Sequence, residues 1–213
     1  MSHESDITTA EGFERAPSFS RRQWDLLDAA LRLLDRNGLS EFTMRALADE
    51  VGLSPMAAYK HFDNQRALQL ELWRECQNHL FDALAAVADK QRDAASAFMA
   101  VASAFVEYAV TYPNRYAFLF SDPFVREAAS VQLIEDRRQD VWARLCGLVS
   151  AAQDARLFRD DQDAESLVVC TASLVRGLAD NVLYARMLGC SDSAERAMRE
   201  SGLARLRDLL IAR

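Results

Sequence analysis

The segment from residue 43 to residue 62 constrains the fold most, because it holds two short helical patterns on either side of a glycine. Met44 and Leu47 recur at the spacing that places apolar side chains on one face of a helix. Thr43 suits the start of that helix, since its hydroxyl can accept a hydrogen bond from a free backbone N–H group. Gly52 tolerates the left-handed conformation with which helices end before sharp turns, so the first helix is predicted to stop there.

A second helix is predicted after the turn, with Ser54 as its cap and Pro55 at its first position. Its inner side would consist of the small or apolar residues Ala57, Ala58 and Phe62. Its outer side would be lined by Met56, Ala57, Tyr59, Lys60 and His61. Two short helices across a glycine-bearing turn form a helix-turn-helix, whose second helix can enter the major groove of DNA.

The outer side of this second helix has the chemistry that DNA contact needs. Tyr59, Lys60 and His61 carry donors for phosphate oxygens and base edges. Ala57 is small enough to let the helix approach closely, and Met56 offers an apolar contact for a thymine methyl group. The alternative from pattern alone is a plain helical hairpin inside a bundle.

The run T-M-R-A-L-A-D-E-V-G-L-S-P-M-A-A-Y-K-H-F resembles the DNA-binding signature of the tetracycline-repressor (TetR) family of bacterial regulators. The resemblance covers roughly residues 20–72 and is one of architecture beyond them. It implies a transcriptional regulator, usually a repressor, that binds a palindromic operator in double-stranded DNA as a homodimer and releases it when a small molecule binds.

One position departs from the family pattern. The family commonly has a lysine shortly after the His-Phe pair, where it contacts a phosphate, and this chain has Gln65 there, followed by Arg66. With glutamine at this position, the phosphate contact has no positive charge unless Arg66 provides one. We assign Thr43 and Arg45 to phosphate contact and Met56, Ala57, Lys60 and His61 to base edges. The complete set of candidate DNA-binding residues is Thr43, Arg45, Ser54, Met56, Ala57, Tyr59, Lys60, His61, Gln65 and Arg66.

The charge balance limits how the chain could bind DNA. The 213 residues carry a net charge of −7, and residues 1–66 hold eight Lys and Arg against eleven Asp and Glu. A protein that coats nucleic acid without sequence preference needs the opposite sign. DNA contacts must therefore come from a small patch and from helix N-termini. The basic residues of that patch would be Arg21, Arg22, Arg45, Lys60 and Arg66.

Four cysteines, Cys76, Cys146, Cys170 and Cys190, lie far apart in helical patterns and form no C-x-x-C pair. They indicate buried reduced thiols rather than a zinc or redox site. The N-terminus has no hydrophobic signal core, and no apolar run approaches the roughly 20 residues that a membrane span needs. We therefore expect a cytoplasmic protein with no cofactor and no membrane partner.

Helical periodicity, with only seven glycines and four prolines, predicts an all-α fold of about nine helices. Residues 1–17 lack periodicity and are expected to be a disordered tail. Residues 18–66 would form the three-helix DNA-binding domain, opened by a capping box at Ser20 and Gln23. Residues 67–213 would form a helical domain for ligand binding and dimerisation. Its helices are predicted near residues 65–89, 93–112, 114–121, 131–156, 161–187 and 192–212, with Asp192 or Ser193 capping the last.

The predicted helix near residues 161–187 is apolar on more than one side, so it must be buried from two directions. The last predicted helix, near residues 192–212, is also rich in apolar residues. We expect both to pack on the core inside and on a second copy outside, as a four-helix contact in a homodimer. The candidate interface residues are Val168, Leu174, Val175, Val182, Leu203, Leu206 and Leu210. The alternative is a fully buried central helix in a monomer.

Aromatic residues concentrate in the middle of the chain, and small-molecule sites are mostly apolar and aromatic with a few polar groups. The candidate effector-binding residues are Phe105, Tyr108, Tyr112, Trp142, Arg176 and Asn181. Arg176 stands out, because a charge embedded in an apolar helix needs a partner, either a protein carboxylate or an acidic ligand group. For any single aromatic residue, packing in the core is the more common role, and the family resemblance is what raises the expectation of a pocket.

Enzymatic and metal chemistry find little support in the sequence. Glu71, Glu75 and His79 share one helical face and could hold a metal, but a solvated charged face explains them equally well. The other histidines lie in the tail and the second short helix, so no histidine base supports nucleophilic catalysis. The sequence thus predicts no metal site and no catalytic residues. Two rival functions remain open: a helical adaptor that docks through the N-terminal hairpin, and a small all-α enzyme.

Overall fold

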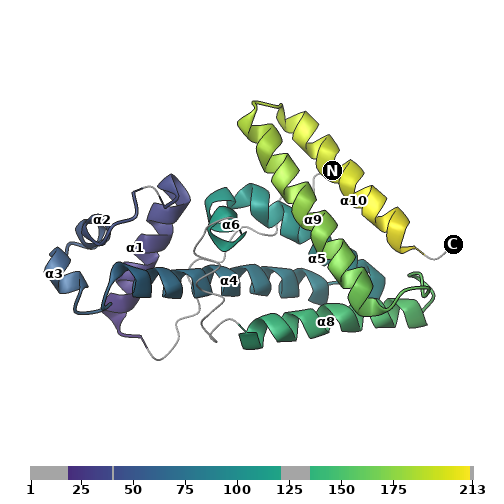
Figure 1. The fold of residues 1–213 in the computed structure, drawn as a ribbon, viewed down its shortest axis with the longest axis horizontal. Coiled ribbons are helices and arrows are strands. Elements are labelled where there is room, and N and C mark those ends of the chain that lie inside the picture. The colour runs from purple at the N-terminus through teal and green to yellow at the C-terminus, as the bar shows by residue number, and fades with distance from the viewer. Residues whose placement is uncertain (1–18, 40, 121–134, 212–213) are drawn as a thin grey trace. The chain divides into compact units, whose positions relative to one another are not determined.

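The computed structural model describes residues 19–39, 41–120 and 135–211, and most of them are helical (Figure 1). The helices are α1 (Arg21–Asn37), α2 (Met44–Glu50), α3 (Pro55–Ala58), α4 (Gln65–Asp89), α5 (Ala94–Thr111), α6 (Pro113–Phe120), α8 (Glu135–Asp154), α9 (Ala164–Met187) and α10 (Asp192–Leu210). Within these ranges the extended structure is limited to an isolated antiparallel bridge between Phe158 and Ile211. The prediction of an all-α fold is confirmed.

The chain forms two compact units. Among the described residues, the first unit holds residues 19–79 and 114–120, and the second holds residues 80–113 and 135–211. The division falls inside α4, whereas the predicted domain boundary after residue 66 lies at the start of that helix. The predicted tail over residues 1–17 and the predicted start of a helix near residue 131 lie outside the described residues.

Side chains cap the helices largely where the sequence predicts caps. At the start of α1, the Ser20 N–H donates to Gln23 Oε1 at 2.9 Å and the Gln23 N–H donates to Ser20 Oγ at 3.3 Å, which completes the capping box. Asp93 and Asp163 cap α5 and α9, and each carboxylate accepts a hydrogen bond from the N–H group of the residue three positions later. For α10 the prediction is wrong by one or two residues, because Ser191 accepts the capping hydrogen bond.

In the first unit, a salt bridge joins the end of α1 to the start of α6. Arg115 Nε and NH2 each donate to the Asp35 carboxylate at 2.7 Å, and Asn114 Nδ2 donates to the Asp35 carbonyl at 2.9 Å. Arg115 is 8% exposed, whereas Asp35 is exposed, so only the arginine side of this bidentate pair is shielded from water. It fixes the end of α1, the helix that braces the helix-turn-helix, against α6.

The core of the second unit forms where α5 packs against α8, α9 and α10. Its buried members include Phe98, Val106, Val149, Val168, Val175, Leu206 and Leu210. Phe98 and Phe158 meet edge to face with ring centroids 5.8 Å apart. The loop that follows α8 is thereby attached to the same core as the C-terminal helix.

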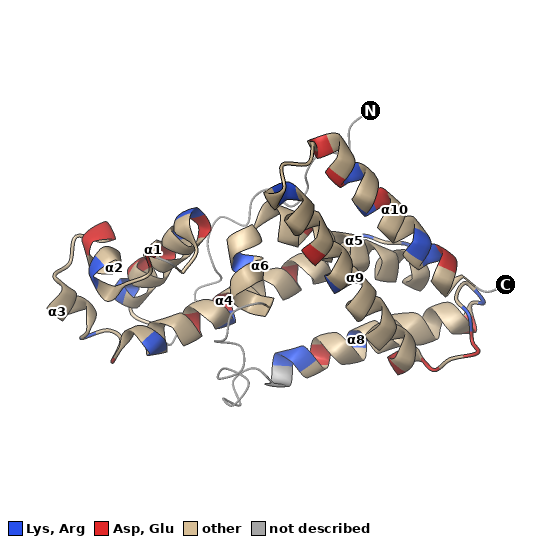
Figure 2. Cartoon of the chain, turned by 45° about the horizontal axis from the view of Figure 1, so that its top comes forward, with Lys and Arg blue, Asp and Glu red and all other residues tan. Residues whose placement is uncertain are grey.

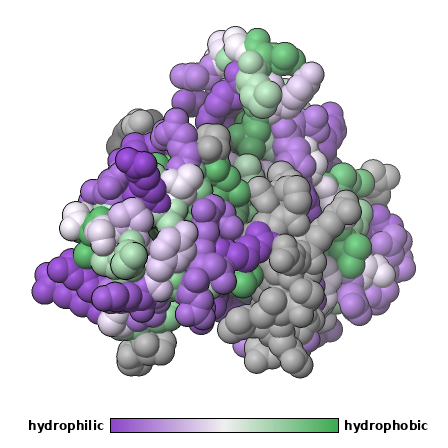
Figure 3. All heavy atoms as spheres, turned by 60° about the vertical axis from the view of Figure 1, so that its left-hand side comes forward, coloured by the Kyte–Doolittle hydropathy of each residue, from purple (hydrophilic) through white to green (hydrophobic). Residues whose placement is uncertain are grey.

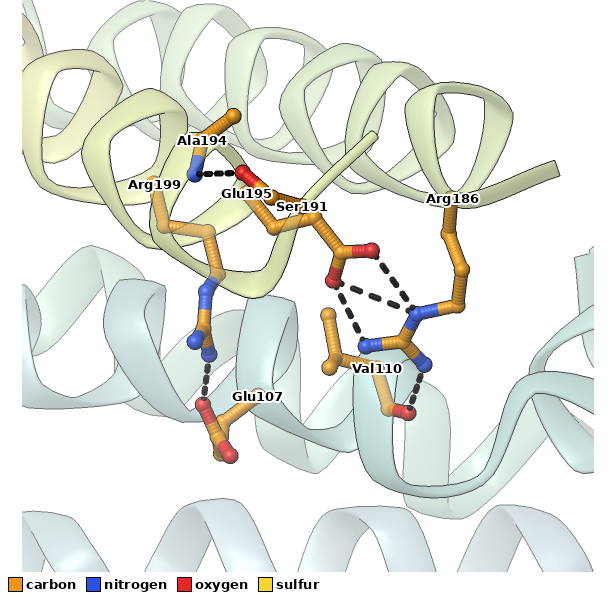
Figure 4. A network of polar contacts seen from close by, with 7 residues as sticks. All are labelled: Glu107, Val110, Arg186, Ser191, Ala194, Glu195 and Arg199. Carbon is orange, nitrogen blue, oxygen red and sulfur yellow. Dashed lines mark hydrogen bonds and ion pairs between the residues drawn. The ribbon is translucent and has the colours of Figure 1, made fainter. Parts of the chain in front are cut away.

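A polar network ties the α9–α10 pair to α5 (Figure 4). The Arg186 guanidinium donates to both carboxylate oxygens of Glu195, at 2.8 to 3.2 Å, and to the Val110 carbonyl at 2.9 Å. Arg199 also pairs with Glu107. Because Glu195 is only 4% exposed, its charge depends on Arg186 for compensation.

The four cysteines differ in exposure, which corrects the expectation that all are buried. Cys76 is fully buried, and desolvation raises the pKa of its thiol to about 12, so the thiol stays protonated at neutral pH. Cys146 is half-buried, whereas Cys170 and Cys190 are exposed. All four are free thiols.

By length and composition, α5 and α9 are apolar enough to cross a membrane, which corrects the expectation that no segment approaches this limit. Their apolar character has another explanation in this fold. Helix α5 lies at the centre of the second unit's core, and α9 buries one stripe of side chains in it. Core helices of this kind satisfy the same compositional test.

The Arg186–Glu195 pair makes a pH-dependent contribution to stability. Hydrogen bonds from Arg186 lower the pKa of Glu195 from its ordinary value of 4.5. The stabilisation is therefore fully present above that value and is lost as the pH falls through the lower pKa of the folded state. We expect Glu195→Gln to lose stability at neutral pH and to show a shallower decline on acidification than wild type, measured by urea unfolding.

Asp208→Asn is the matched control, because Asp208 is also on α10 but pairs with Arg205 at an exposed position. This variant should keep the wild-type pH profile. A Glu195→Gln profile that is parallel to wild type below pH 5 would contradict the assignment.

Candidate nucleic-acid interface

The turn after α2 has the geometry that the sequence predicts. Gly52 has a φ of +67°, in the left-handed region that favours glycine. The Leu53 N–H donates to the Ala48 carbonyl at 2.8 Å and the Gly52 N–H donates to the Asp49 carbonyl at 3.3 Å. This pair of hydrogen bonds is the Schellman arrangement, which ends α2 and redirects the chain.

The second helix of the motif is shorter than predicted. Helix α3 covers only four residues, although Ser54 caps it by accepting a hydrogen bond from the Ala57 N–H at 3.2 Å. The chain continues as turns, in which His61 and Phe62 both donate to the Ala58 carbonyl, at 3.0 and 3.3 Å. The predicted inner and outer sides can still be told apart, because the backbone stays tightly wound through Phe62.

Burial separates the two sides of this segment. Ala58 is fully buried and Phe62 is 5% exposed, whereas Met56 is 77% exposed and Tyr59 is 49% exposed. Lys60 is exposed as well. Ala57 and His61 are half-buried, which fits the placement of Ala57 on the border of both sides. The side offered to a partner therefore centres on Met56, Tyr59 and Lys60.

Two glutamine side chains support the segment from neighbouring helices. Gln23 Nε2 of α1 donates to the His61 carbonyl at 3.2 Å. Gln65 Nε2 of α4 donates to the Phe42 carbonyl at 2.8 Å, before the start of α2. The amide nitrogen of Gln65 is thus used within the first unit, so its main role here is to position the motif. Arg66, the neighbouring candidate, is half-buried.

The hydroxyl groups of Thr43 and Ser54 act as helix caps, yet they remain open to further contact. Each accepts one backbone hydrogen bond, Thr43 from Ala46 at 3.1 Å, and both residues are exposed. A capping hydroxyl keeps its own hydrogen for donation. Arg45 follows Thr43 and is exposed. The phosphate contacts assigned to Thr43 and Arg45 are therefore compatible with their positions.

Acidic residues near the motif are partly compensated. Glu50, at the end of α2, pairs with Arg36 and lies 3.7 Å from Arg32, and hydrogen bonding from Arg36 lowers the pKa of its carboxyl group. Basic and acidic residues alternate over α1 and α2 rather than forming one basic stripe (Figure 2). The face seen in Figure 3 is mainly hydrophilic, with apolar residues in small patches. This distribution suits a focused contact.

The predicted effector residues do not come together around one cavity. Tyr108 is 1% exposed and packs beside Tyr112 with tilted rings whose centroids are 5.2 Å apart, while Phe105 and Trp142 pack against the core. Arg176 is exposed rather than embedded in apolar surroundings.

Asn181 is also exposed, and its Nδ2 donates to the Gly177 carbonyl at 2.8 Å. A cavity of about 220 Å³ that the described residues form between α4, α5 and α8 is lined by none of the six predicted effector residues.

The predicted dimer residues divide between two sides of α9 and α10. Five of the seven are buried within the single chain, namely Val168, Val175, Val182, Leu206 and Leu210. Leu203 is half-buried, and Leu174 is 45% exposed. The heptad spacing of the three valines marks the inner stripe of α9, because residues seven apart face the same direction. The prediction that these five face a second copy is therefore wrong.

A different stripe of α9 faces outward. Cys170, Leu174, Tyr184 and Leu188 follow the helical repeat along one face, and all are exposed. Tyr184 is 59% exposed and Leu188 is 66% exposed. This outward stripe is absent from the predicted set apart from Leu174. Apolar residues occur on most faces of α9, so the sequence alone does not indicate which face is buried.

The candidate metal-binding residues on α4 are engaged with a basic side chain. Arg74 lies 2.6 Å from Glu71 and 3.6 Å from Glu75. Across the described residues, no three His, Cys, Asp or Glu side chains form a cluster suited to a metal.

Comparisons with known proteins agree with the geometry of the N-terminal unit. Residues 26–72 match the model of the bacterial regulatory proteins of the tetR family. Over 136 residues the chain is 26% identical to YobS of Bacillus subtilis (strain 168), an uncharacterized HTH-type transcriptional regulator. That alignment covers 63% of this chain and 65% of YobS, just under two thirds of the relative's length.

Solved structures share the fold over nearly the whole chain. KstR2, a ketosteroid transcriptional regulator of Mycobacterium tuberculosis, superposes with a TM-score of 0.63 at 20% identity, covering 93% of this chain and 99% of KstR2. A proposed transcriptional regulator from Saccharomonospora viridis, solved in complex with choline, gives a TM-score of 0.72 at 21% identity, covering 90% and 98%. The helix-turn-helix geometry and the matched signature together identify residues 26–72 as a domain of the kind found in the bacterial regulatory proteins of the tetR family, and the solved structures show that the chain shares their fold.

Proposed function

We propose that the protein is a cytoplasmic, homodimeric transcriptional repressor that binds a palindromic operator and releases it when a small hydrophobic molecule binds. The observation that carries the proposal is the exposure of Met56, Tyr59 and Lys60 on the outer side of α3 and the turns after it. A buried inner side and a polar, exposed outer side are what a segment needs to lie in a major groove.

The contacts divide into two kinds in this proposal. Arg45, Thr43 and Ser54 contact phosphates and set the register on the duplex, while Met56, Lys60 and His61 reach base edges. Helix α3 is short and begins with Ser54 and Pro55, so the close approach depends on the small side chain of Ala57. Two copies would place these segments in successive major grooves, one helical turn of about 34 Å apart.

A small-molecule effector is supported by the solved relatives. KstR2 is named for ketosteroids, and the Saccharomonospora viridis protein holds choline. A molecule bound in the second unit would favour one of two dimer states, and it can release DNA only through a difference in its affinity for those states. We assign no enzymatic activity to the chain.

The outward stripe of α9 supports the homodimer. Exposed apolar side chains that follow one face of a long helix are typical of surfaces that another chain covers. On α10, Met198 and Leu209 are 37% and 51% exposed and share a face as well. A two-fold contact between α9 and α10 of two copies would bury all of these residues in a four-helix arrangement.

Operator binding is tested by Tyr59→Phe and Lys60→Ala on a palindromic fragment that the wild-type protein retains from genomic DNA. We expect Tyr59→Phe to weaken binding about fivefold, the effect of one lost hydrogen bond. Lys60→Ala should weaken binding further and lower the slope of log K against log salt by about 1, because one phosphate or base-edge charge is removed.

Arg92→Ala, which removes one exposed positive charge from the turn between α4 and α5, is the matched control and should leave the gel shift unchanged. Unfolding curves and size-exclusion profiles establish that each variant is folded and dimeric. An unchanged gel shift for Lys60→Ala at moderate salt would contradict the assignment of this segment to DNA contact.

Dimerisation is tested by Leu174→Lys and Tyr184→Lys, which place a charge on the outward stripe of α9. We expect both variants to shift the dimer dissociation constant upward by at least tenfold in sedimentation velocity, because an unpaired buried charge opposes association. Leu157→Lys changes an equally exposed leucine in the loop after α8 and should leave the association unchanged. Wild-type association of both stripe variants would contradict this interface.

A further inference from the structure

The recognition segment, residues 54–62, is held at its C-terminal end by a side chain of α1. The last carbonyl groups of a helical run have no partner within that run. The His61 carbonyl has a partner from outside, because Gln23 Nε2 donates to it at 3.2 Å. His61 directly follows Tyr59 and Lys60 in the chain, so this hydrogen bond holds the backbone that carries two of the exposed side chains.

Gln23 is itself fixed by the start of α1. Its Oε1 accepts hydrogen bonds from the Ser20 N–H and from the Ser20 hydroxyl, each at 2.9 Å. A backbone N–H can only donate and a carbonyl can only accept, so the partners at the two ends determine which way the amide points. The half-buried Gln23 side chain thus joins the first turn of α1 to the end of the recognition segment.

A second amide acts from the other side of the recognition segment. Gln65 is the first residue of α4 and lies three positions after Phe62. Its Nε2 donates to the Phe42 carbonyl at 2.8 Å. Phe42 directly precedes Thr43, the residue that caps α2. The first turn of α4 is therefore joined to the start of α2, the helix on the far side of the turn.

These two hydrogen bonds supply what the apolar contacts do not. Burial of Ala58 and Phe62 selects the inner side of the segment, but the hydrophobic effect has no directional preference. Hydrogen bonds weaken steeply when distance or angle changes, so they fix a position more narrowly. Helix α3 has only four residues and is too short to be rigid alone. Its exact position therefore depends on groups outside it.

We propose that Gln23 and Gln65 are positioning residues for operator recognition. They hold the recognition segment where Met56, Tyr59 and Lys60 meet the duplex, and they do so without contacting DNA. Phosphate contacts carry no sequence information, whereas base contacts require accurate placement of the side chains. The two glutamines therefore act on the preference for the operator over other DNA. The inference rests on the proposed function, and in it Gln65 acts through α2 rather than through a phosphate.

Gln23→Met and Gln65→Met test this role, because methionine is unbranched like glutamine but has no amide donor. Fluorescence anisotropy of the full-length protein gives its affinity for the retained operator fragment and for a scrambled duplex of equal length and composition. We expect each variant to lower operator affinity about three- to tenfold, the effect of one lost hydrogen bond. Affinity for the scrambled duplex should stay unchanged, so the ratio of the two affinities falls by the same factor.

Three further variants serve as controls. Gln91→Met removes an amide donor whose Nε2 donates to the Val87 carbonyl at 3.2 Å, after the end of α4, and should change neither affinity. Ser20→Ala removes the capping hydroxyl but keeps the Ser20 N–H that holds Gln23, so the ratio should stay at the wild-type value. Arg45→Ala removes a proposed phosphate contact and should lower both affinities together.

The ratio of affinities separates positioning from stability. A variant that is partly unfolded loses affinity for both duplexes by the same factor, because only the folded fraction binds. The inference is overturned if Gln23→Met and Gln65→Met keep the wild-type ratio, whether both affinities fall together or neither changes.

Hydrogen exchange of the free protein gives a second readout that needs no DNA. Without the hydrogen bond to the His61 carbonyl, the backbone N–H groups of residues 59–62 should exchange faster in Gln23→Met, while those of α5 keep their wild-type protection. Wild-type exchange at residues 59–62 would contradict the positioning role of Gln23.

The same affinities distinguish this inference from the proposed function. A wild-type protein that binds no genomic fragment more tightly than its scrambled duplex would contradict the proposed function. A wild-type preference that both glutamine variants retain in full would contradict only the inference and leave operator binding standing.

Discussion

The burial of Ala58 and Phe62 decides which side of the segment after Gly52 faces solvent. Phe19 bridges the aromatic cluster, with its ring centroid 5.5 Å from Trp24 and 6.3 Å from Phe62. Burying a phenylalanine side chain stabilises a fold by about 1.5–3 kcal/mol, enough to hold a four-residue helix that could not persist alone. Because Phe62 is held inside, Met56, Tyr59 and Lys60 must be outside. DNA contact by this segment depends on that partition.

Local signals in the sequence predict local structure well. The hydroxyls of Thr43 and Ser54, the capping box at Ser20 and the left-handed Gly52 each act within four residues of their own position, so the sequence contains both partners of each hydrogen bond. The all-α fold and the helix-turn-helix follow from such signals. The predicted start of α10 is wrong by only one or two residues, because three adjacent residues, Ser191, Asp192 and Ser193, can all cap a helix.

Long-range packing could not be predicted in this way. Helix α9 has apolar residues around most of its circumference, and its packing against α5, α8 and α10 determines that Val175 is buried while Leu174 is exposed. The salt bridge between Asp35 and Arg115 joins residues 80 positions apart and has no local signature. The cavity between α4, α5 and α8 is likewise lined by alanines of α4, which the sequence shows only as ordinary helix-forming residues. Helix α4 contributes residues to both compact units, so in the proposed function it is the covalent link between DNA binding and effector binding.

The central claim is that the outer side of the Ser54–Phe62 segment lies against a DNA duplex. Photocrosslinking from position 56 tests this most directly: p-benzoylphenylalanine is placed there in the full-length protein and irradiated with a retained operator fragment. We predict a covalent protein–DNA product that maps to the major groove of each half-site, with no such product from the same group at position 157. A folded, DNA-binding protein that crosslinks from position 157 but not from position 56 would contradict the account.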